Sequence, residues 1–235
     1  ACAAAAALAA MGPAGRKLAC NVAERLESDD AEIRAACLLA LGRMQLAGSR
    51  HEDLICRRLA DSSAQVAVAA CVCLGQIAAD TSASSIATTS LLMLLTDSRP
   101  CLRAAALSSL SHMGETARDH VHLISAMLKD RSWSVRASAI RALAACGEAG
   151  HVFATVVCRM CLSDINVRVR VAAIECLVTF GGRAASCVED LASLLEDPSA
   201  EVRSAAIKVL LTVGGVEARD LVDAHLQMEP FDSVR

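Results

Sequence analysis

Apolar residues recur along this chain at intervals of three and four residues, the spacing that places side chains on one face of an α-helix. In the middle of the chain, two such runs cover residues 121–128 and 135–146, with a polar turn at 130–134 between them. Gly147 follows the second run, and glycine there readily takes the positive-φ backbone that ends a helix. Gly114, Gly181 and Gly214 are the equivalent predicted stops in other parts of the chain. The pattern therefore predicts two helices joined by a short turn.

This arrangement repeats along the chain at intervals of 33 to 36 residues. Each copy has an aspartate, a short polar turn, an apolar residue and then an arginine, which is alanine in the second copy. The aspartates are Asp29, Asp61, Asp97, Asp130, Asp164 and Asp197, the first lying one place closer to its arginine. The arginine positions are Arg34, Ala67, Arg103, Arg136, Arg170 and Arg203. A fixed period of this length is the signature of stacked structural repeats.

Two further positions of the repeat support close packing of its second helix. The residue seven places after the arginine is always leucine: Leu41, Leu74, Leu110, Leu143, Leu177 and Leu210. The residue two places after it is always small: Ala36, Ala69, Ala105, Ser138, Ala172 and Ala205. Small residues let neighbouring helices approach, so we expect helical hairpins that stack on copies of themselves.

The same frame predicts one repeat array over residues 1–235. If Leu8 is the leucine of an earlier copy, the chain begins on the second helix of a preceding repeat. The parent protein would then continue upstream, unless the alanine-rich start is a poorly determined stretch. We predict a partial unit at 1–12, units at about 13–46, 47–80, 81–114, 115–147, 148–181 and 182–214, and a partial unit at 215–235.

Composition narrows the class of protein. Hydrophobic residues make up 54% of the chain and aromatic residues only 2%, which suits closely packed helices better than sheets. The net charge of −3 gives no basic footprint for nucleic acid, and no apolar run is long enough to span a membrane. The 12 cysteines are scattered through apolar stretches, as packed thiols would be. We therefore expect a reducing compartment, the cytoplasm or an organelle interior.

The repeated phrase Asp-x4-(Val/Leu)-Arg-x2-Ala-x3-Leu-x3-Gly resembles the HEAT-repeat superfamily, in particular the short HEAT-like units of phycobilin-lyase-type proteins. The resemblance covers essentially the whole chain. It implies an all-α, right-handed superhelical solenoid of antiparallel helix pairs, similar to armadillo arrays. In that family the repeated Asp and Arg form a ladder between turns, and the aspartate lies where a helix N-cap is useful.

Three patterns that could suggest chemistry have a structural explanation. The Asp–Arg pairs recur in consecutive repeats, as a structural ladder would. Cys158 and Cys161 fall on one helical face without a third or fourth ligand at zinc spacing. His51-Glu52 resembles the His-Glu pairs of deoxyhypusine hydroxylase, but that iron enzyme needs several pairs and this chain has one. We therefore predict no enzyme activity, no cofactor and no metal site.

A partner surface is predicted on the second helices of the N-terminal half. In the resembling family these helices line the concave face. The exposed side of the first two complete repeats carries Leu39, Val68 and Val72, with Arg43 and Gln76 at its edge. An exposed apolar patch of this kind suits an amphipathic helix laid in a groove. Alternatively, side chains of the preceding repeat or upstream sequence cover Leu39 and Val72.

Trp133 is the single tryptophan of the chain and lies in a polar turn. Tryptophan is enriched among the residues that dominate protein interfaces, so Trp133 is a second candidate for partner binding. Alternatively, its ring folds over the adjacent turn and only stabilises it.

These features predict a non-catalytic scaffold that binds one or more protein partners, or a structural subunit of a larger assembly. Two alternatives stay open. The chain could be a lyase-like or chaperone-like helper that acts on a tetrapyrrole-bearing protein, or a spacer within a longer repeat protein.

Overall fold

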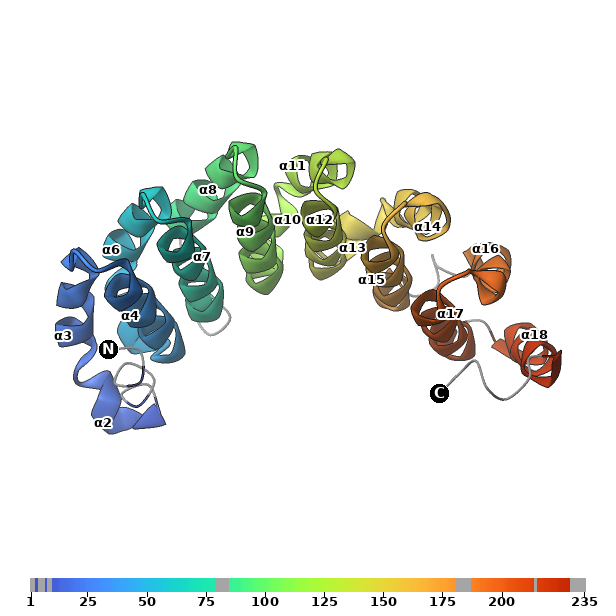
Figure 1. Ribbon diagram of the computed structural model, residues 1–235, viewed down its shortest axis with the longest axis horizontal. Helices are drawn as coiled ribbons and strands as arrows, with labels where there is room; N and C mark the ends of the chain where they lie inside the picture. The colour runs from blue at the N-terminus through green and yellow to red at the C-terminus, as the bar shows by residue number, and fades with distance from the viewer. Residues whose placement is uncertain are drawn as a thin grey trace. The chain divides into compact units, whose positions relative to one another are not determined.

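A computed structural model describes residues 3, 7, 10–78, 85–180, 187–213 and 215–228. All regular elements in these residues are α-helices or short 3-10 helices (Figure 1). The prediction of an all-α fold built from helix pairs is therefore confirmed.

The chain divides into two compact units, Ala1–Leu123 and Ile124–Arg235. In each unit the second helix of every pair packs beside the second helix of the next pair. In unit 1 these are α4 (Ala31–Arg43), α7 (Ala64–Ala78) and α9 (Pro100–Met113). In unit 2 they are α12 (Trp133–Ala145), α15 (Val167–Leu177) and α17 (Ala200–Val213). The exact limits of the six predicted repeats stay a prediction.

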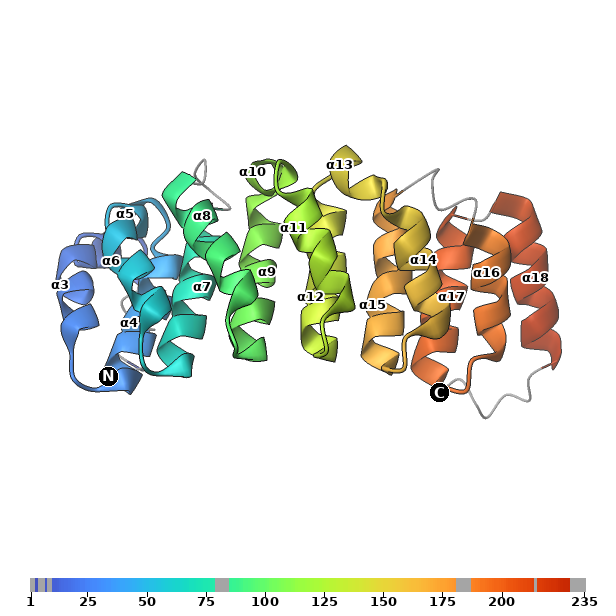
Figure 2. The same cartoon turned by 90° about the horizontal axis from the view of Figure 1, so that it is seen from above.

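The first helices form a second row beside these within each unit (Figure 2). They are α3 (Ala19–Glu24), α6 (Glu52–Arg57) and α8 (Ser85–Met93) in unit 1, and α14 (Ala154–Ser163), α16 (Val188–Ser193) and α18 (Gly215–Met228) in unit 2. α11 (Val121–Ala126) contains the point of division. Among the described residues, 3-10 helices continue first helices toward the turn: η1 (Arg25–Glu27), η2 (Arg58–Ala60), η3 (Leu94–Thr96), η4 (Met127–Lys129) and η6 (Leu194–Glu196).

The leucine that recurs in every repeat lies in the core between the two rows. All six of these leucines are at most 2% exposed. Successive second helices also approach closely: a Cβ atom added at Gly75 would lie 3.0 Å from the Cα of Ser109 on the next helix. The helical frame read from the sequence is correct for the core.

A sharp bend separates each second helix from a one-turn connector, and it needs positive φ. Gly114 (φ 48°) and Gly147 (φ 57°) supply it before α10 (Glu115–Arg118) and α13 (Glu148–His151). Gln45 has a φ of 53° before α5 (Leu46–Ser49), a conformation that costs a non-glycine residue energy. A similar connector, α2 (Pro13–Arg16), follows Gly12.

Two of the predicted glycine stops, Gly181 and Gly214, lie outside the described residues, as does Leu8. Near the second of these stops the positive φ belongs to Gly215, at 66°.

The Asp–Arg ladder is present in both units. Arg34 donates to both carboxylate oxygens of Asp61 in the next turn, at 2.9 and 2.8 Å. Arg136 reaches Asp164 in the same way, at 2.7 Å for both bonds. Arg136 also donates to the backbone carbonyl of Asp130 in its own turn, at 2.9 Å. Each such arginine therefore ties two successive turns together.

The aspartates mostly do not cap the helices that follow them. Asp164 accepts a bond at 2.9 Å from the backbone N–H of Asn166, and Asn166 is the N-cap of α15. In the first copy the N-cap of α4 is Asp30, which follows the repeat aspartate Asp29 and accepts from the N–H of Glu32 at 2.8 Å. The expected capping role is thus wrong for Asp97, Asp130 and Asp164. Each lies two residues before the N-cap position, and its carboxylate accepts the backbone N–H of the N-cap residue.

The second copy lacks the ladder arginine, and the turn that follows compensates locally. Ala67 replaces the arginine that would reach Asp97. Instead Arg99 folds back and donates two bonds to the Asp97 carboxylate, both at 3.0 Å. The buried Ser109 hydroxyl adds a bond of 2.6 Å to the carbonyl of Cys71, which joins α9 to α7.

These ion pairs predict acid sensitivity. The hydrogen bond from Arg34 lowers the pKa of Asp61, and the bond from Arg99 lowers the pKa of Asp97. A carboxyl whose folded pKa lies below its unfolded value of about 3.9 contributes stability above that value, and the contribution is lost as the pH falls through the folded pKa. We expect the free energy of unfolding to hold steady between about pH 5 and 7 and to fall steadily below about pH 4.

Urea titrations followed by circular dichroism measure this dependence. Arg34→Ala should make the fall in the free energy of unfolding at low pH smaller, because Asp61 loses the partner that lowers its pKa. An unfolding free energy that stays constant down to pH 3 would contradict the role of these pairs.

Candidate functional site

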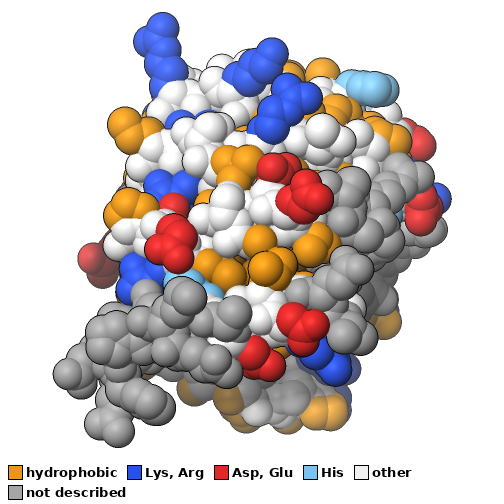
Figure 3. Space-filling model, turned by 90° about the vertical axis from the view of Figure 1, so that its right-hand side faces the viewer, with side chains coloured by type: hydrophobic (Ala, Val, Ile, Leu, Met, Phe, Trp, Pro, Cys, Tyr) orange, Lys and Arg blue, Asp and Glu red, His pale blue; other side chains and the backbone are white. Residues whose placement is uncertain are grey.

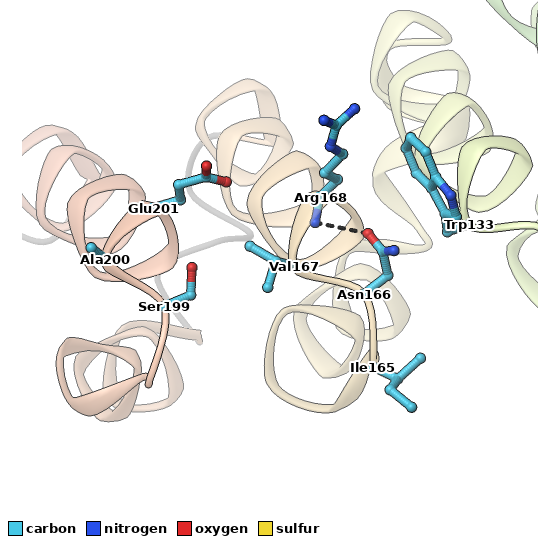
Figure 4. Close-up of a pocket in the computed structure, with 8 residues that line it drawn as sticks. All are labelled: Trp133, Ile165, Asn166, Val167, Arg168, Ser199, Ala200 and Glu201. Atoms are coloured by element: carbon cyan, nitrogen blue, oxygen red, sulfur yellow. Dashed lines mark hydrogen bonds between the residues drawn. The ribbon is translucent and has the colours of Figure 1, made fainter.

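A hollow of about 750 Å³ in unit 2, which we call the shelf, lies where α12, α15 and α17 begin (Figure 4). It is formed by the N-terminal ends of these helices and by the loops that precede α15 and α17. Its lining includes Trp133, Ile165, Val167, Arg168, Ser199 and Glu201. These residues occupy equivalent places in three successive copies of the repeat. Because the repeats are stacked, positions that vary from copy to copy form one continuous surface.

Trp133 is the first residue of α12, so its predicted place in the turn is wrong; it is exposed on the shelf and has a neighbour from the next repeat. Its side chain is 40% exposed, and the guanidinium carbon of Arg168 lies 5.2 Å from the centre of the ring. A cation over an indole face is an attractive arrangement. Asn166 accepts the backbone N–H of Arg168 at 3.0 Å, which fixes the start of α15 beneath that side chain. Trp133 thus contacts the neighbouring repeat.

Ile165 is the most exposed large apolar residue of the described chain, at 93%. It occupies a turn position where other copies have Ser62, Ser98, Arg131 and Pro198. Sequence reasoning missed Ile165 and Arg168. An isoleucine inside a polar turn is the signal that could have identified this position.

A second hollow, of about 600 Å³, lies between α15 and α17, and we call it the groove. Val171 and Val178 provide apolar surface above the buried Val209, while Glu175 and Lys208 are exposed beside them. Glu201 lines both hollows, so the shelf and the groove adjoin. Together they form a mixed surface of apolar side chains with charged edges on the second helices of unit 2.

The predicted surface of unit 1 is partly exposed. Leu39 is 41% exposed and Arg43 is exposed, whereas Val68, Val72 and Gln76 are half-buried. Their role in binding stays a prediction. The two glycines beside them serve close packing: the place of a Cβ at Gly42 is filled by the side-chain amide of Gln76, and Gly75 adjoins Ser109.

Seen from the side of α18, unit 2 shows hydrophobic side chains between acidic and basic ones (Figure 3). Among the side chains that the structure describes on its last two helices, Leu211 is 43% exposed and Leu221 is 48% exposed.

The cysteines are mostly packed thiols. Cys158 and Cys161 are 3% and 1% exposed, and burial raises the pKa of both thiols. Burial likewise raises the pKa of Cys71 to about 12. His51 precedes α6 and is half-buried. In the described part of the chain, no three His, Cys, Asp or Glu side chains are placed to hold a metal ion.

The chain resembles known proteins in its sequence repeats and in its fold. A family model described as HEAT repeats matches residues 19–111 and 154–235. No curated protein matches the sequence. No helix among the described residues has the length and apolar character needed to cross a membrane.

Three solved structures illustrate the similarity of fold. An engineered protein is 18% identical, with a TM-score of 0.58 over 87% of this chain and 96% of its own. A chain in the complex of CpcE and CpcF of phycocyanin lyase from Nostoc sp. PCC7120 is 18% identical, with a TM-score of 0.60 over 91% of this chain and 89% of its own. Kap121p is 16% identical, with a TM-score of 0.66 over 87% of this chain but only 24% of its own. At these identities the likeness concerns the fold alone.

Proposed function

The chain belongs to the HEAT-repeat family, and from this premise we propose that it is a non-catalytic scaffold that binds a protein partner through the second helices of unit 2. The observation that carries the proposal is the groove between α15 and α17. It adjoins the shelf at Glu201, and Trp133 lies on that shelf. Apolar surface surrounded by charged side chains is the composition of a protein interface, with an apolar centre and a polar rim. Exposed aromatic residues are often the anchors of such an interface.

Two substitutions of equal chemistry test this proposal. Val178 lies in the groove and is 38% exposed, whereas Val156 lies on the first helix α14 and is 41% exposed. We expect Val178→Glu to lose most of the partner that the unaltered protein recovers from its native source, and Val156→Glu to retain it. Melting curves of both variants serve as the control for folding. Equal recovery by the two variants, with equal melting temperatures, would refute the role of the groove.

The same experiment addresses the other hypotheses. Leu39→Glu tests the predicted surface of unit 1. Visible absorbance of a tetrapyrrole in the recovered material would favour a helper of a pigment-bearing protein, a hypothesis motivated by the similar fold of the phycocyanin lyase complex. If no substitution on either surface changes recovery, a spacer role is favoured.

A further inference from the structure

Three exposed basic side chains lie next to Trp133, in the chain or on the shelf, while the exposed Glu201 lines the shelf beyond Arg168, at the start of α17 (Figure 4). Lys129, Arg131 and Arg168 are all exposed, and the first two lie within four residues of Trp133 in the chain. None of these three side chains forms an ion pair with a carboxylate in the described parts of the chain. The guanidinium of Arg168 instead lies over the indole ring.

The aspartates of the same turns are occupied by the repeat itself. Asp164 accepts two bonds from Arg136 at 2.7 Å and one from the N–H of Asn166. Asp130 accepts from the N–H of Ser132 at 2.8 Å. These carboxylates are half-buried in the ladder, so the basic side chains dominate the exposed end of the shelf near Trp133.

The apolar part of the shelf lies beside these cations. Trp133 exposes part of its ring and Ile165 nearly all of its side chain. Arg168 lies between Trp133 and the start of α17 (Figure 4). A carboxylate that pairs with the fork of Arg168 would therefore be placed next to apolar surface, where a large aliphatic side chain of the same ligand could be buried.

We propose that the shelf binds a segment of a protein partner in which acidic residues flank large aliphatic ones; the inference rests on the proposed scaffold function. Charge complementarity selects the acidic residues, and Trp133 with Ile165 selects the aliphatic ones. Nucleic acid is the alternative occupant that the experiment must exclude, because the cations near Trp133 would also attract phosphates.

Trp133 is the single tryptophan, so its fluorescence reports directly on the shelf. The probe is a ten-residue peptide of glutamate alternating with leucine, titrated into the full chain. Two control peptides replace either every glutamate by lysine or every leucine by serine. We expect a saturable change in fluorescence with the first peptide and affinities at least about tenfold weaker with both controls. The first affinity should fall as salt is added.

Matched variants locate the site. Arg168→Gln should weaken binding of the acidic peptide about tenfold, as expected for loss of one charge-assisted contact. Arg159→Gln removes an exposed arginine from the first helix α14 and should leave binding unchanged. Glu201→Gln should leave the affinity equal or raise it, because it removes a like charge. Circular dichroism verifies that each variant is folded.

The inference is overturned if the acidic peptide gives no saturable change, if the lysine peptide binds equally well, or if single-stranded DNA binds more tightly than the acidic peptide. Its failure is separable from failure of the scaffold function. If Val178→Glu loses the partner while the shelf binds no acidic peptide, the scaffold function stands and this inference is wrong.

Discussion

Leu143→Ala should lower the free energy of unfolding by about 2–5 kcal/mol. Leu143 is fully buried in α12, and truncation leaves a cavity among side chains that cannot all move to fill it. The measurement is a urea titration followed by circular dichroism. Because repeat arrays are stabilised by contacts between neighbours, the loss should also appear as an earlier transition of unit 2.

Leu162→Ala is the matched control, since Leu162 is 39% exposed on the neighbouring first helix. We expect a change within about 0.5 kcal/mol, as is usual for surface positions. Similar losses at the two leucines would contradict the assignment of Leu143 to the core.

Arg136→Ala should cost about 2–3 kcal/mol, somewhat less than the about 3–5 kcal/mol typical of breaking a fully buried pair. The side chains of Arg136 and Asp164 are 14% and 7% exposed, so removal of the arginine leaves a poorly solvated carboxylate. Burial acts to raise the pKa of Asp164, while the hydrogen bonds from Arg136 act against it and the net direction is downward. Without Arg136 the pKa of Asp164 should rise.

Two comparisons make this second prediction specific. Arg141→Ala removes an exposed arginine from the same helix and should change stability by about 0.5 kcal/mol or less. Adding Asp164→Asn to Arg136→Ala should recover part of the loss, because the unpaired buried charge is removed. If the double variant is as unstable as the sum of both single variants, the two side chains act independently.

The repeat separates constant structure from variable function. The ladder arginine, the core leucine and the small residue two places after the arginine are constrained by packing between successive helices. The position three places before the arginine is the first residue of the second helix, and it differs from copy to copy, from Ala64 to Trp133 and Val167. A scaffold of this kind can change its ligand by changing such residues, because the core does not depend on them.

Local periodicity by itself determined the helix pairs, the repeat and the buried leucines. A helix buries the same face in every copy, so the spacing of apolar residues reports which side chains lie in the core. The sequence also predicted the ends of two second helices at Gly114 and Gly147, because the bend there requires a positive-φ backbone that glycine adopts easily.

Only the tertiary structure decided how residues of different repeats combine. Arg168 lies over Trp133, and Gln76 fills the place beside Gly42, although about 35 residues separate the members of each pair in the chain. Arg99 replaces a missing ladder arginine because the carboxylate of Asp97 is within its reach. Such contacts depend on the distance and rotation between stacked helices, which a pattern with a period of 3.6 residues does not encode.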